Sequence, residues 1–600
     1  MFQSFVDTAR PEQGPPRLAA LRAAMAEAGL AGFLVPRADA HQGEYVAACD
    51  ERLAWLTGFT GSAGICIVLA QAAAIFVDGR YRAQVRTQVD TAHFTPLDWP
   101  ETRPGEWLRE TLAEGGTVGF DPWLHTPEDI AQLERDLAGS AIALKPAANM
   151  IDRIWPDRPA PPCGAVAVYP GRLAGESHAA RRARLAEGLR RAGHSAAVLT
   201  MPDSIAWLLN IRGSDIPRNP VPHAFAILHD NGHVTLFIEP AKLDETVRAH
   251  LGPEVLTRPP NALLPGLRTL RGPVRLDRAR VPLAIARQLE EAGVPVAWGE
   301  DPCLLPKARK TAAEIAATRA AHLRDGAAMC EFLAWFDSQP PGTLTEIDVV
   351  TRLEAERRAT GELRDISFDT IAGAGPHGAL AHYRVTETSN RTLQAGDLLV
   401  LDSGGQYLDG TTDITRTLPV GRVGSQERAA FTRVLQGMIA ISRLRWPKGL
   451  AGRDLDAIAR YPLWLADQDY AHGTGHGVGV YLCVHEGPQR LSRISEVALE
   501  PGMILSNEPG YYRDGAFGIR IENLLVVREA EPLEGGDSGA RLAFETLTHV
   551  PIDRRLIVPQ MLSAPERAWL DAYHATCAER IGPRLSSGAR AWLEAATAPL

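Results

Sequence analysis

The stretch GDLLVLDSGGQYLDGTTDITRT, residues 396–417, decides the fold of the C-terminal half, because it predicts a β-hairpin that carries two aspartates. Apolar segments flank a glycine-rich turn, which is typical of two strands joined by a loop. A turn centred between Tyr407 and Leu408 would place Asp402 directly opposite Asp413, with Cβ atoms roughly 5 Å apart. Carboxylates that close repel each other unless a cation lies between them. The stretch suggests a metal-binding hairpin, although two solvent-facing aspartates would fit the same pattern.

A second pair of acids follows the same logic in SNEPGYYRDGAFGIRIENLLVV, residues 506–527. Asp514 and Gly515 form a strong turn signal, and Glu508 and Glu522 are equally distant from Gly515. A hairpin centred there would pair the two glutamates across the ladder, on one face.

The segment AHGTGHGVGVYLCVHEGP, which lies between the two hairpins, contains His472, His476 and His485. Four carboxylates and at least one imidazole suit manganese, cobalt, iron or zinc, as two ions roughly 3.5 to 4 Å apart with a water between them. Four carboxylates balance two divalent ions, whereas without cations they would need raised pKa values. The pattern therefore predicts a dinuclear metal site. The glycines here lack the spacing of a dinucleotide-binding loop.

The N-terminal half contains an internal repeat. RLAALRAAMAEAGLAGFLV from Arg17 is echoed by RRARLAEGLRRAGHSAAVL from Arg181, and each predicts an amphipathic helix that ends at a glycine before a buried strand. ERLAWLTGFTGSAG from Glu51 is echoed by PDSIAWLLNIRGSD from Pro202. A period of roughly 160 residues is too long for a solenoid, so we predict two similar α/β domains that arose by duplication.

Proline-rich joints divide the chain into three predicted domains. IWPDRPAPPCG closes the first, and GEDPCLLPKARKTAAEI closes the second. We therefore predict domains at residues 1–157, 158–306 and 307–600, with a helical C-terminal extension at about 540–600. The third domain opens with two predicted helices, one from Ala312 to Asp337 and one that runs from a Thr345 N-cap to Ala359.

Composition and charge restrict the class of protein. A hydrophobic fraction of 45% with 22% charged residues is ordinary for a globular protein, and a net charge of -9 gives no nucleic-acid footprint. The N-terminus lacks the apolar core of a signal peptide, and the most apolar window, residues 63–77, is too short to span a bilayer. Seven scattered cysteines favour reduced thiols. We expect a cytoplasmic protein without nucleic-acid or membrane partners.

The motifs LDSGGQYLDGTTDITRT, HGTGHGVGVYLCVHEGP, SNEPGYY and GIRIEN resemble those of aminopeptidase P, the Xaa-Pro aminopeptidases of the creatinase-like pita-bread superfamily. GSAG, DGRY, IAWLLNIRGSDIP, ETLTHVPID and ERAWLDAYH resemble the long, three-domain form, so the likeness covers essentially the whole chain. It implies an α/β fold with two creatinase N-terminal-like domains, followed by an α+β pita-bread metallopeptidase domain. It also implies a homodimer.

The resemblance implies five metal ligands, none of them substituted here: Asp402, Asp413, His476, Glu508 and Glu522. Asp413 and Glu522 would bridge two divalent ions, usually manganese, with cobalt, zinc and iron as alternatives. The implied reaction is hydrolysis of the bond between an N-terminal residue and a following proline by a metal-bridging hydroxide. Glu508 would accept and return the proton.

Four further residues are candidates for the substrate site. The family pattern has substrate-site histidines at His382 and His485, with His485 stabilising the tetrahedral intermediate and His382 shaping the leaving side. His472 would either line the proline pocket or brace the glycine-rich loop. Arg520 lies two residues before Glu522 on the same face, where it would orient a ligand carboxylate or a substrate group, a solvated charge being the alternative.

Three other functions share the fold. A prolidase uses the same metal site but takes only Xaa-Pro dipeptides, and the two-domain N-terminal half argues against it. A catalytically inert peptide- or protein-binding module would have lost ligands, whereas the set here is complete. A creatinase is disfavoured by the additional domain and by the context of the histidines.

Overall fold

The computed structural model describes the whole chain, residues 1–600, which folds into two compact units. The N-terminal unit consists of Thr8–Gly171 and Glu176–Leu304, and the C-terminal unit of Met1–Asp7, Arg172–Gly175 and Leu305–Leu600. The boundary that we predict near residue 157 lies inside the N-terminal unit and stays a prediction. None of the helices combines the length and the apolar character that crossing a bilayer requires.

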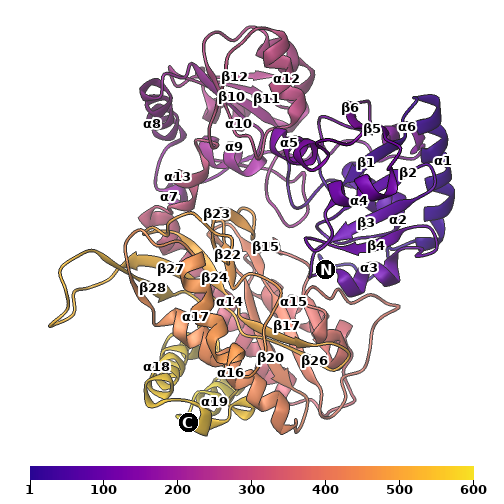
Figure 1. Ribbon diagram of the computed structural model, residues 1–600. Coiled ribbons are helices and arrows are strands. Elements are labelled where there is room, and N and C mark those ends of the chain that lie inside the picture. The colour runs from indigo at the N-terminus through magenta and orange to yellow at the C-terminus, as the bar shows by residue number, and fades with distance from the viewer. The chain divides into compact units, whose positions relative to one another are not determined.

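The N-terminal unit contains two six-stranded mixed sheets with the same topology (Figure 1). In chain order the first sheet comprises β1 (Gly32–Pro36), β2 (Ile65–Leu69), β3 (Ala73–Val77), β4 (Thr95–Asp98), β5 (Gly116–Phe120) and β6 (Ile142–Pro146). The second comprises β8 (Ala196–Leu199), β10 (Phe225–His229), β11 (Val234–Phe237), β12 (Val255–Arg258), β13 (Val274–Leu276) and β14 (Val296–Trp298). The spatial orders β4-β3-β2-β1-β5-β6 and β12-β11-β10-β8-β13-β14 correspond strand by strand, which confirms the predicted pair of similar α/β folds.

The helices of the N-terminal unit follow the same repeat. α1 (Gly14–Glu27) and α8 (His178–Arg191) precede the first strand of each sheet, and the positive φ angles of Gly29 (65°) and Gly193 (70°) end them as predicted. The other helices of the two halves are α2 (Arg52–Thr57), α3 (Arg82–Gln88), α4 (Pro104–Thr111), α5 (Pro127–Asp136), α6 (Met150–Ile154), α9 (Pro202–Leu209), α10 (Glu245–Leu251), α11 (Leu263–Leu267) and α12 (Leu283–Glu291).

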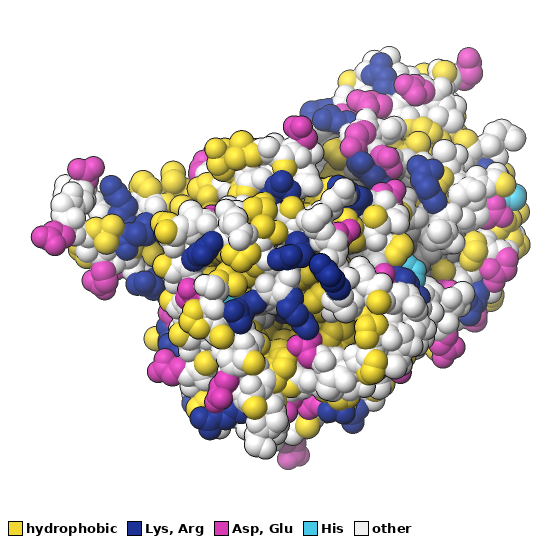
Figure 2. All heavy atoms as spheres, turned by 90° about the horizontal axis from the view of Figure 1, so that it is seen from below, with side chains coloured by type: hydrophobic (Ala, Val, Ile, Leu, Met, Phe, Trp, Pro, Cys, Tyr) yellow, Lys and Arg dark blue, Asp and Glu magenta, His cyan; other side chains and the backbone are white.

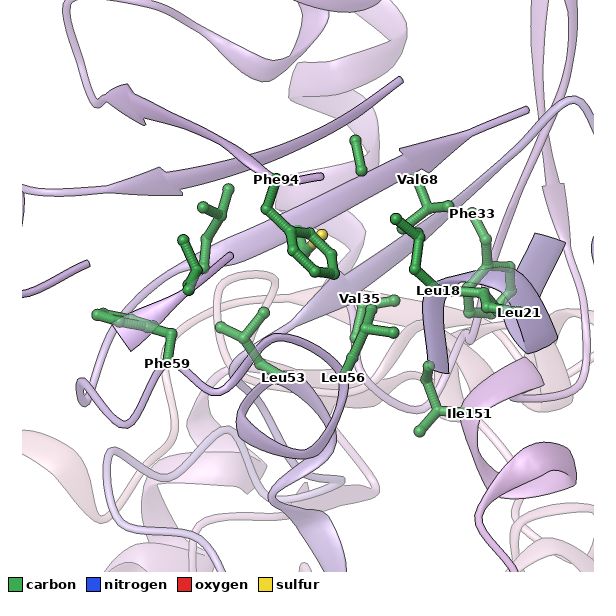
Figure 3. Packing of buried hydrophobic residues seen from close by; sticks show 14 of the residues in the cluster. Leu18, Leu21, Phe33, Val35, Leu53, Leu56, Phe59, Val68, Phe94 and Ile151 are labelled. Atoms are coloured by element: carbon green, nitrogen blue, oxygen red, sulfur yellow. The ribbon is translucent and has the colours of Figure 1, made fainter. Parts of the chain in front are cut away.

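The first sheet is buried on both faces. Phe33 and Val35 of β1 pack with Leu18 and Leu21 of α1 (Figure 3), whereas Leu34 belongs to a separate hydrophobic cluster. Such double burial is typical of sheets covered by helices on both sides, and each side chain of this size contributes about 1.5–3 kcal/mol.

The C-terminal unit is an α+β arrangement of several sheets and six long helices. Its largest sheet has the order β21 (Arg445–Pro447), β28 (Arg541–Thr546), β27 (Asn523–Glu529), β24 (Ile504–Asn507), β22 (Gly475–Gly477) and β23 (Glu486–Leu491). The smaller sheets are β16 (Ile371–Ala374), β17 (Leu398–Ser403) and β20 (Ile414–Pro419); β15 (Leu363–Ile366), β18 (Gly405–Tyr407) and β19 (Gly410–Thr411); and β25 (Gly510–Arg513) with β26 (Phe517–Arg520).

The helices of this unit begin where the sequence predicts. α14 spans Ala312–Asp337, and α15 (Glu346–Ala359) follows Thr345, whose hydroxyl accepts a hydrogen bond from the N–H of Asp348. The remaining long helices are α16 (Ser425–Ser442), α17 (Arg453–Trp464), α18 (Ala564–Ile581) and α19 (Ser587–Ala596), the last two forming the helical C-terminal extension.

The first acidic hairpin forms, but its register differs from the prediction. Asp402 of β17 pairs with Thr415 of β20, so the predicted direct opposition of Asp402 and Asp413 is wrong. The turn is one residue further along, because Tyr407 pairs with Gly410 and leaves Leu408 and Asp409 as the loop. The residue opposite Asp402 is therefore Thr415, two positions beyond Asp413. Residues two positions apart in a strand lie on the same face, so Asp402 and Asp413 still share a face.

The second acidic hairpin has the predicted register. Gly510 pairs with Arg520 and Asn507 with Asn523, so ladder pairs on both sides bracket Glu508 and Glu522. Gly515 has a φ of 66° at the turn, which a glycine adopts without strain.

All seven cysteines are unpaired. On the face seen in Figure 2, several lysine and arginine side chains lie close together near the middle, with apolar and acidic side chains around them.

Candidate metal centre

The five candidate ligands come from separate strands and loops of the C-terminal unit. Asp402 lies near the end of β17, Asp413 directly precedes β20, and His476 is the central residue of β22. Glu508 follows β24, and Glu522 lies between β26 and β27. Asp402, Asp413 and Glu522 are 7%, 4% and 1% exposed, so their charges lie in a poorly solvated interior.

His476 contacts the acids at distances that one metal ion could span. Its Nε2 lies 3.4 Å from Asp413 Oδ2 and 3.4 Å from Glu508 Oε1, and ligand atoms of Asp413, His476 and Glu522 lie within 4.8 Å of one another. Two ligands bound about 2.0–2.2 Å from one ion have a similar separation. His476 Nδ1 lies 2.9 Å from Gly477 O, and a proton donated there leaves Nε2 free to bind a metal.

The electrostatics of the acids fit a pair of divalent cations. Burial, together with neighbouring carboxylates, raises the pKa of Asp413 and of Glu522 well above the usual values. Burial also raises the pKa of Glu508. Asp402 Oδ1, Asp413 Oδ1 and Glu522 Oε1 are buried and have no hydrogen-bond partner. Orphaned carboxylate oxygens that share one interior are costly unless cations bind them, so these residues fit a dinuclear centre.

Arg520 is part of this network and is not a solvated charge. It is 2% exposed, and its Nη2 donates to Asp402 Oδ2 at 2.7 Å. Its Nε donates to Thr415 Oγ1 at 3.2 Å, and Thr415 Oγ1 in turn donates to Glu522 Oε2 at 2.8 Å. Arg520 therefore fixes one candidate ligand directly and a second one through Thr415.

His472 joins the same network through Tyr512. Its Nε2 lies 2.9 Å from the Tyr512 hydroxyl, which also accepts a hydrogen bond from Arg520, and its Nδ1 lies 2.7 Å from Gly473 O. Both ring nitrogens of His472 therefore lie beside polar groups of the protein.

The other two histidines occupy different places. The ring of His485 lies 4.4 Å from the ring of His476, edge to face, which brings His485 to the ligand cluster. His382 is half-buried in the turn after η5 (Gly375–Ala379), and η5 packs against β26, the strand of Arg520.

Sequence reasoning did not identify three residues that position the ligands. Thr415 and Tyr512 link Arg520 to Glu522 and to His472, as described above. Ser506 Oγ accepts from the N–H of His476 at 2.9 Å and donates to Glu508 Oε1 at 3.1 Å. All three lie inside the recognised motifs, but strand periodicity gives only the face of a side chain and not its partner.

Glu486, next to His485, is held by two buried lysines. Lys307 Nζ lies 2.7 Å from Glu486 Oε2, Lys310 Nζ contacts Oε1, and the three side chains are 0–2% exposed. The two lysines compensate the charge of the buried carboxylate. They also fix the start of β23, which begins directly after His485.

Removing one of these lysines should weaken the C-terminal unit. We expect Lys310→Met to lower the free energy of unfolding by about 3 kcal/mol, because Glu486 loses one of its two buried cations. Arg309→Ala is the matched control: Arg309 is 42% exposed in its ion pair with Glu500, and its loss should cost less than about 1 kcal/mol. Urea denaturation monitored by fluorescence measures both variants, and equal midpoints would contradict the arrangement.

The raised carboxylate pKa values predict how the metal-free protein responds to pH. The unfolded chain releases the protons of these carboxyl groups at a pH of about 4, whereas the native state keeps them to a higher pH. The native state therefore loses stability as the pH rises above about 4. We expect the urea midpoint of the chelator-treated protein to decrease as the pH is raised from 5 to 8, because Asp413, Glu508 and Glu522 must then ionise without a cation. Added manganese should displace these protons and remove most of the decrease. A midpoint that manganese leaves unchanged at pH 8 would argue against a metal centre.

Family models match nearly the whole chain. Residues 316–529 match the model of metallopeptidase family M24, and residues 540–600 match the C-terminal region of that peptidase. Residues 17–154 and 157–314 each match a creatinase/prolidase N-terminal domain, so the two α/β halves and the α+β unit have the expected fold classes.

Curated relatives and a solved structure agree with the family models. A probable Xaa-Pro aminopeptidase P of Aspergillus fumigatus is 38% identical over 97% of this chain and 92% of its own. Aminopeptidase P2 of Arabidopsis thaliana is 38% identical over 97% of this chain and 88% of its own. The crystal structure of an X-prolyl aminopeptidase from Caenorhabditis elegans, described as a cytosolic enzyme with a di-nuclear active site, superposes with a TM-score of 0.93 at 32% identity, covering 98% of this chain and 100% of that one.

Proposed function

The chain belongs to metallopeptidase family M24, among the Xaa-Pro aminopeptidases P, and on this premise we propose that it hydrolyses the bond between an N-terminal residue and a penultimate proline. The observation that carries the proposal is the group of buried, orphaned carboxylate oxygens around His476. A binding module without catalysis would have no need to keep such an electrostatically costly group.

Asp402, Asp413, His476, Glu508 and Glu522 would hold two divalent ions, and Asp413 and Glu522 would be shared between them. Manganese is the proposed metal, because four carboxylates and one imidazole form an oxygen-rich set. When bound, two such ions lower the pKa of a water and polarise a carbonyl oxygen.

The protein's own groups then move the proton and hold the substrate. Glu508, whose pKa burial raises, accepts a proton from the attacking water and returns it to the proline nitrogen. His485, beside His476, donates a hydrogen bond to the oxyanion that forms on the scissile carbonyl. His382 contacts the leaving side, where the substrate proline offers no N–H to grip.

The network behind the ligands has a positioning role. Arg520 holds Asp402 at 2.7 Å, and Tyr512 joins Arg520 to His472. These contacts fix the orientation of the carboxylates that would hold the ions, so we assign Arg520 to positioning of the ligands and His472 to positioning of the glycine-rich loop.

We further propose that the protein is a cytoplasmic homodimer. Three large apolar side chains in and after α17 are exposed, Tyr461 at 60%, Trp464 at 42% and Leu465 at 72%, and such a group of exposed apolar side chains supports self-association. Light scattering on the purified protein measures the mass directly.

Substitution of a bridging ligand tests the metal assignment. We expect Asp413→Asn to lower kcat/KM for an Xaa-Pro-Xaa peptide by at least about 100-fold and to lose bound manganese, because a neutral amide cannot bridge two cations. Asp409→Asn is the matched control, since Asp409 lies at the tip of the same hairpin and pairs with Arg324 at 2.8 Å. Full activity of Asp413→Asn after chelation and reloading would contradict the bridging role.

Peptide length separates the proposed activity from that of a prolidase. We expect the manganese-loaded protein to cleave Gly-Pro-Gly-Gly and to leave the dipeptide Gly-Pro largely intact, because a dipeptidase must hold the free carboxylate of proline. Chromatography of the products measures both reactions. Efficient cleavage of Gly-Pro alone would replace the proposal with the dipeptidase.

A further inference from the structure

A second group of potential metal ligands lies in the N-terminal unit. Asp39 follows β1, Asp50 ends the short helix η2 (Ala48–Asp50), and His223 precedes β10. One ligand atom from each lies within 4.8 Å of the other two. Asp39 and Asp50 belong to the first half of the duplication and His223 to the second half, so the group joins the two repeats.

Asp39 carries a buried carboxylate oxygen without a partner. The residue is 1% exposed, and its Oδ1 accepts hydrogen bonds from the N–H groups of His41 at 2.9 Å and Gly43 at 3.2 Å. Its Oδ2 is buried without a hydrogen bond and faces His223, whose Nε2 lies 3.5 Å away. A buried carboxylate oxygen without a partner is costly, and a cation bound there would offset that cost.

The lysine and arginines of this region either bind another acid or contact only Oδ1 of Asp50, as Arg158 also does at 3.5 Å. Lys242 Nζ donates to Asp215 Oδ2 at 2.6 Å. Arg52 binds Asp152 at 2.6 Å and Asp50 Oδ1 at 2.8 Å. Asp50 Oδ2 has only the weak thiol donor of Cys49, at 3.4 Å, and therefore keeps a lone pair for another ligand.

His223 lies at the distance that a metal ligand needs. The 3.5 Å between its Nε2 and Asp39 Oδ2 is close to the edge of a tetrahedron, about 3.4 Å for ligands 2.0–2.1 Å from the metal. The His41 ring lies 4.3 Å from the His223 ring and stacks on Phe225 at 4.5 Å, which forms an aromatic wall beside the group.

We propose that Asp39, Asp50 and His223 bind a divalent transition-metal ion that ties the two α/β repeats of the N-terminal unit together. One imidazole nitrogen and two carboxylate oxygens, with water in a fourth position, suit zinc. The ion compensates the charge of Asp39, and its role is structural, because both repeats supply ligands. The site is independent of the catalytic proposal, since no residue is shared.

Metal content tests the proposal on the full-length protein. After chelation, reloading with zinc and desalting, we expect Asp39→Asn and His223→Ala to hold one zinc equivalent fewer than the wild type. His229→Ala is the matched control, because His229 lies on the neighbouring strand β10 and its Nε2 contacts Thr235 at 3.1 Å. It should keep the wild-type content. Asp413→Asn should keep the extra ion, which separates this site from the catalytic centre.

A second measurement does not use the variants of the proposed ligands, so it does not depend on how they fold. We expect zinc to slow hydrogen–deuterium exchange in peptides that cover residues 39–50 and 223, in the wild type and in Asp413→Asn alike. Equal zinc content in wild type, Asp39→Asn and His223→Ala would overturn the proposal. Exchange in these peptides that does not respond to zinc would overturn it as well.

Discussion

Repulsion between buried carboxylates is the constraint on which the C-terminal unit depends. Asp402, Asp413, Glu508 and Glu522 converge in an interior where burial, together with neighbouring carboxylates, raises the pKa of the last three. Arg520 pairs with Asp402 and relieves this repulsion only in part. The hydroxyls of Thr415 and Ser506 fix the carboxylate oxygens of Glu522 and Glu508 in place. The fold thus holds the acids ready for cations and leaves neutralisation to the metal ions.

The sequence predicted most of this arrangement, because turn chemistry and strand period are local properties. Asp514 and Gly515 set the second hairpin correctly, and the glycines after α1 and α8 ended those helices as expected. The first hairpin was misplaced by one residue because several glycines compete for its turn, and the short β18–β19 pair decides among them. Tertiary pairing, not local preference, selected that register.

Contacts between residues far apart in the sequence could not be predicted from turn chemistry and strand period. Glu486 lies in a recognised motif, yet its two cations come from Lys307 and Lys310, more than 170 residues earlier. Tyr512 sits on a predicted strand, but its contact with His472, 40 residues earlier, depends on how the glycine-rich loop packs against this hairpin. Periodicity tells which side of a strand a residue occupies, whereas the identity of its neighbour is set by the packed fold.

A buried carboxylate oxygen without a partner, close to other ligand atoms, distinguishes the two candidate metal sites from the other buried acids. Asp325 has Arg357 at 2.8 Å, Asp456 has Arg460 at 2.7 Å, and Glu486 has its lysines. Asp301 also has an orphaned oxygen, but it belongs to neither group of converging ligand atoms.

Asp39 combines an orphaned oxygen with a neighbouring histidine and a second acid, as Asp413 does in the C-terminal unit. The duplication does not explain this group, because Asp39 follows the first strand of its repeat whereas His223 precedes the second strand of the other. Residues from non-equivalent positions that converge on one uncompensated charge indicate a feature acquired after the duplication. A shared ion would then hold two formerly independent domains in one geometry.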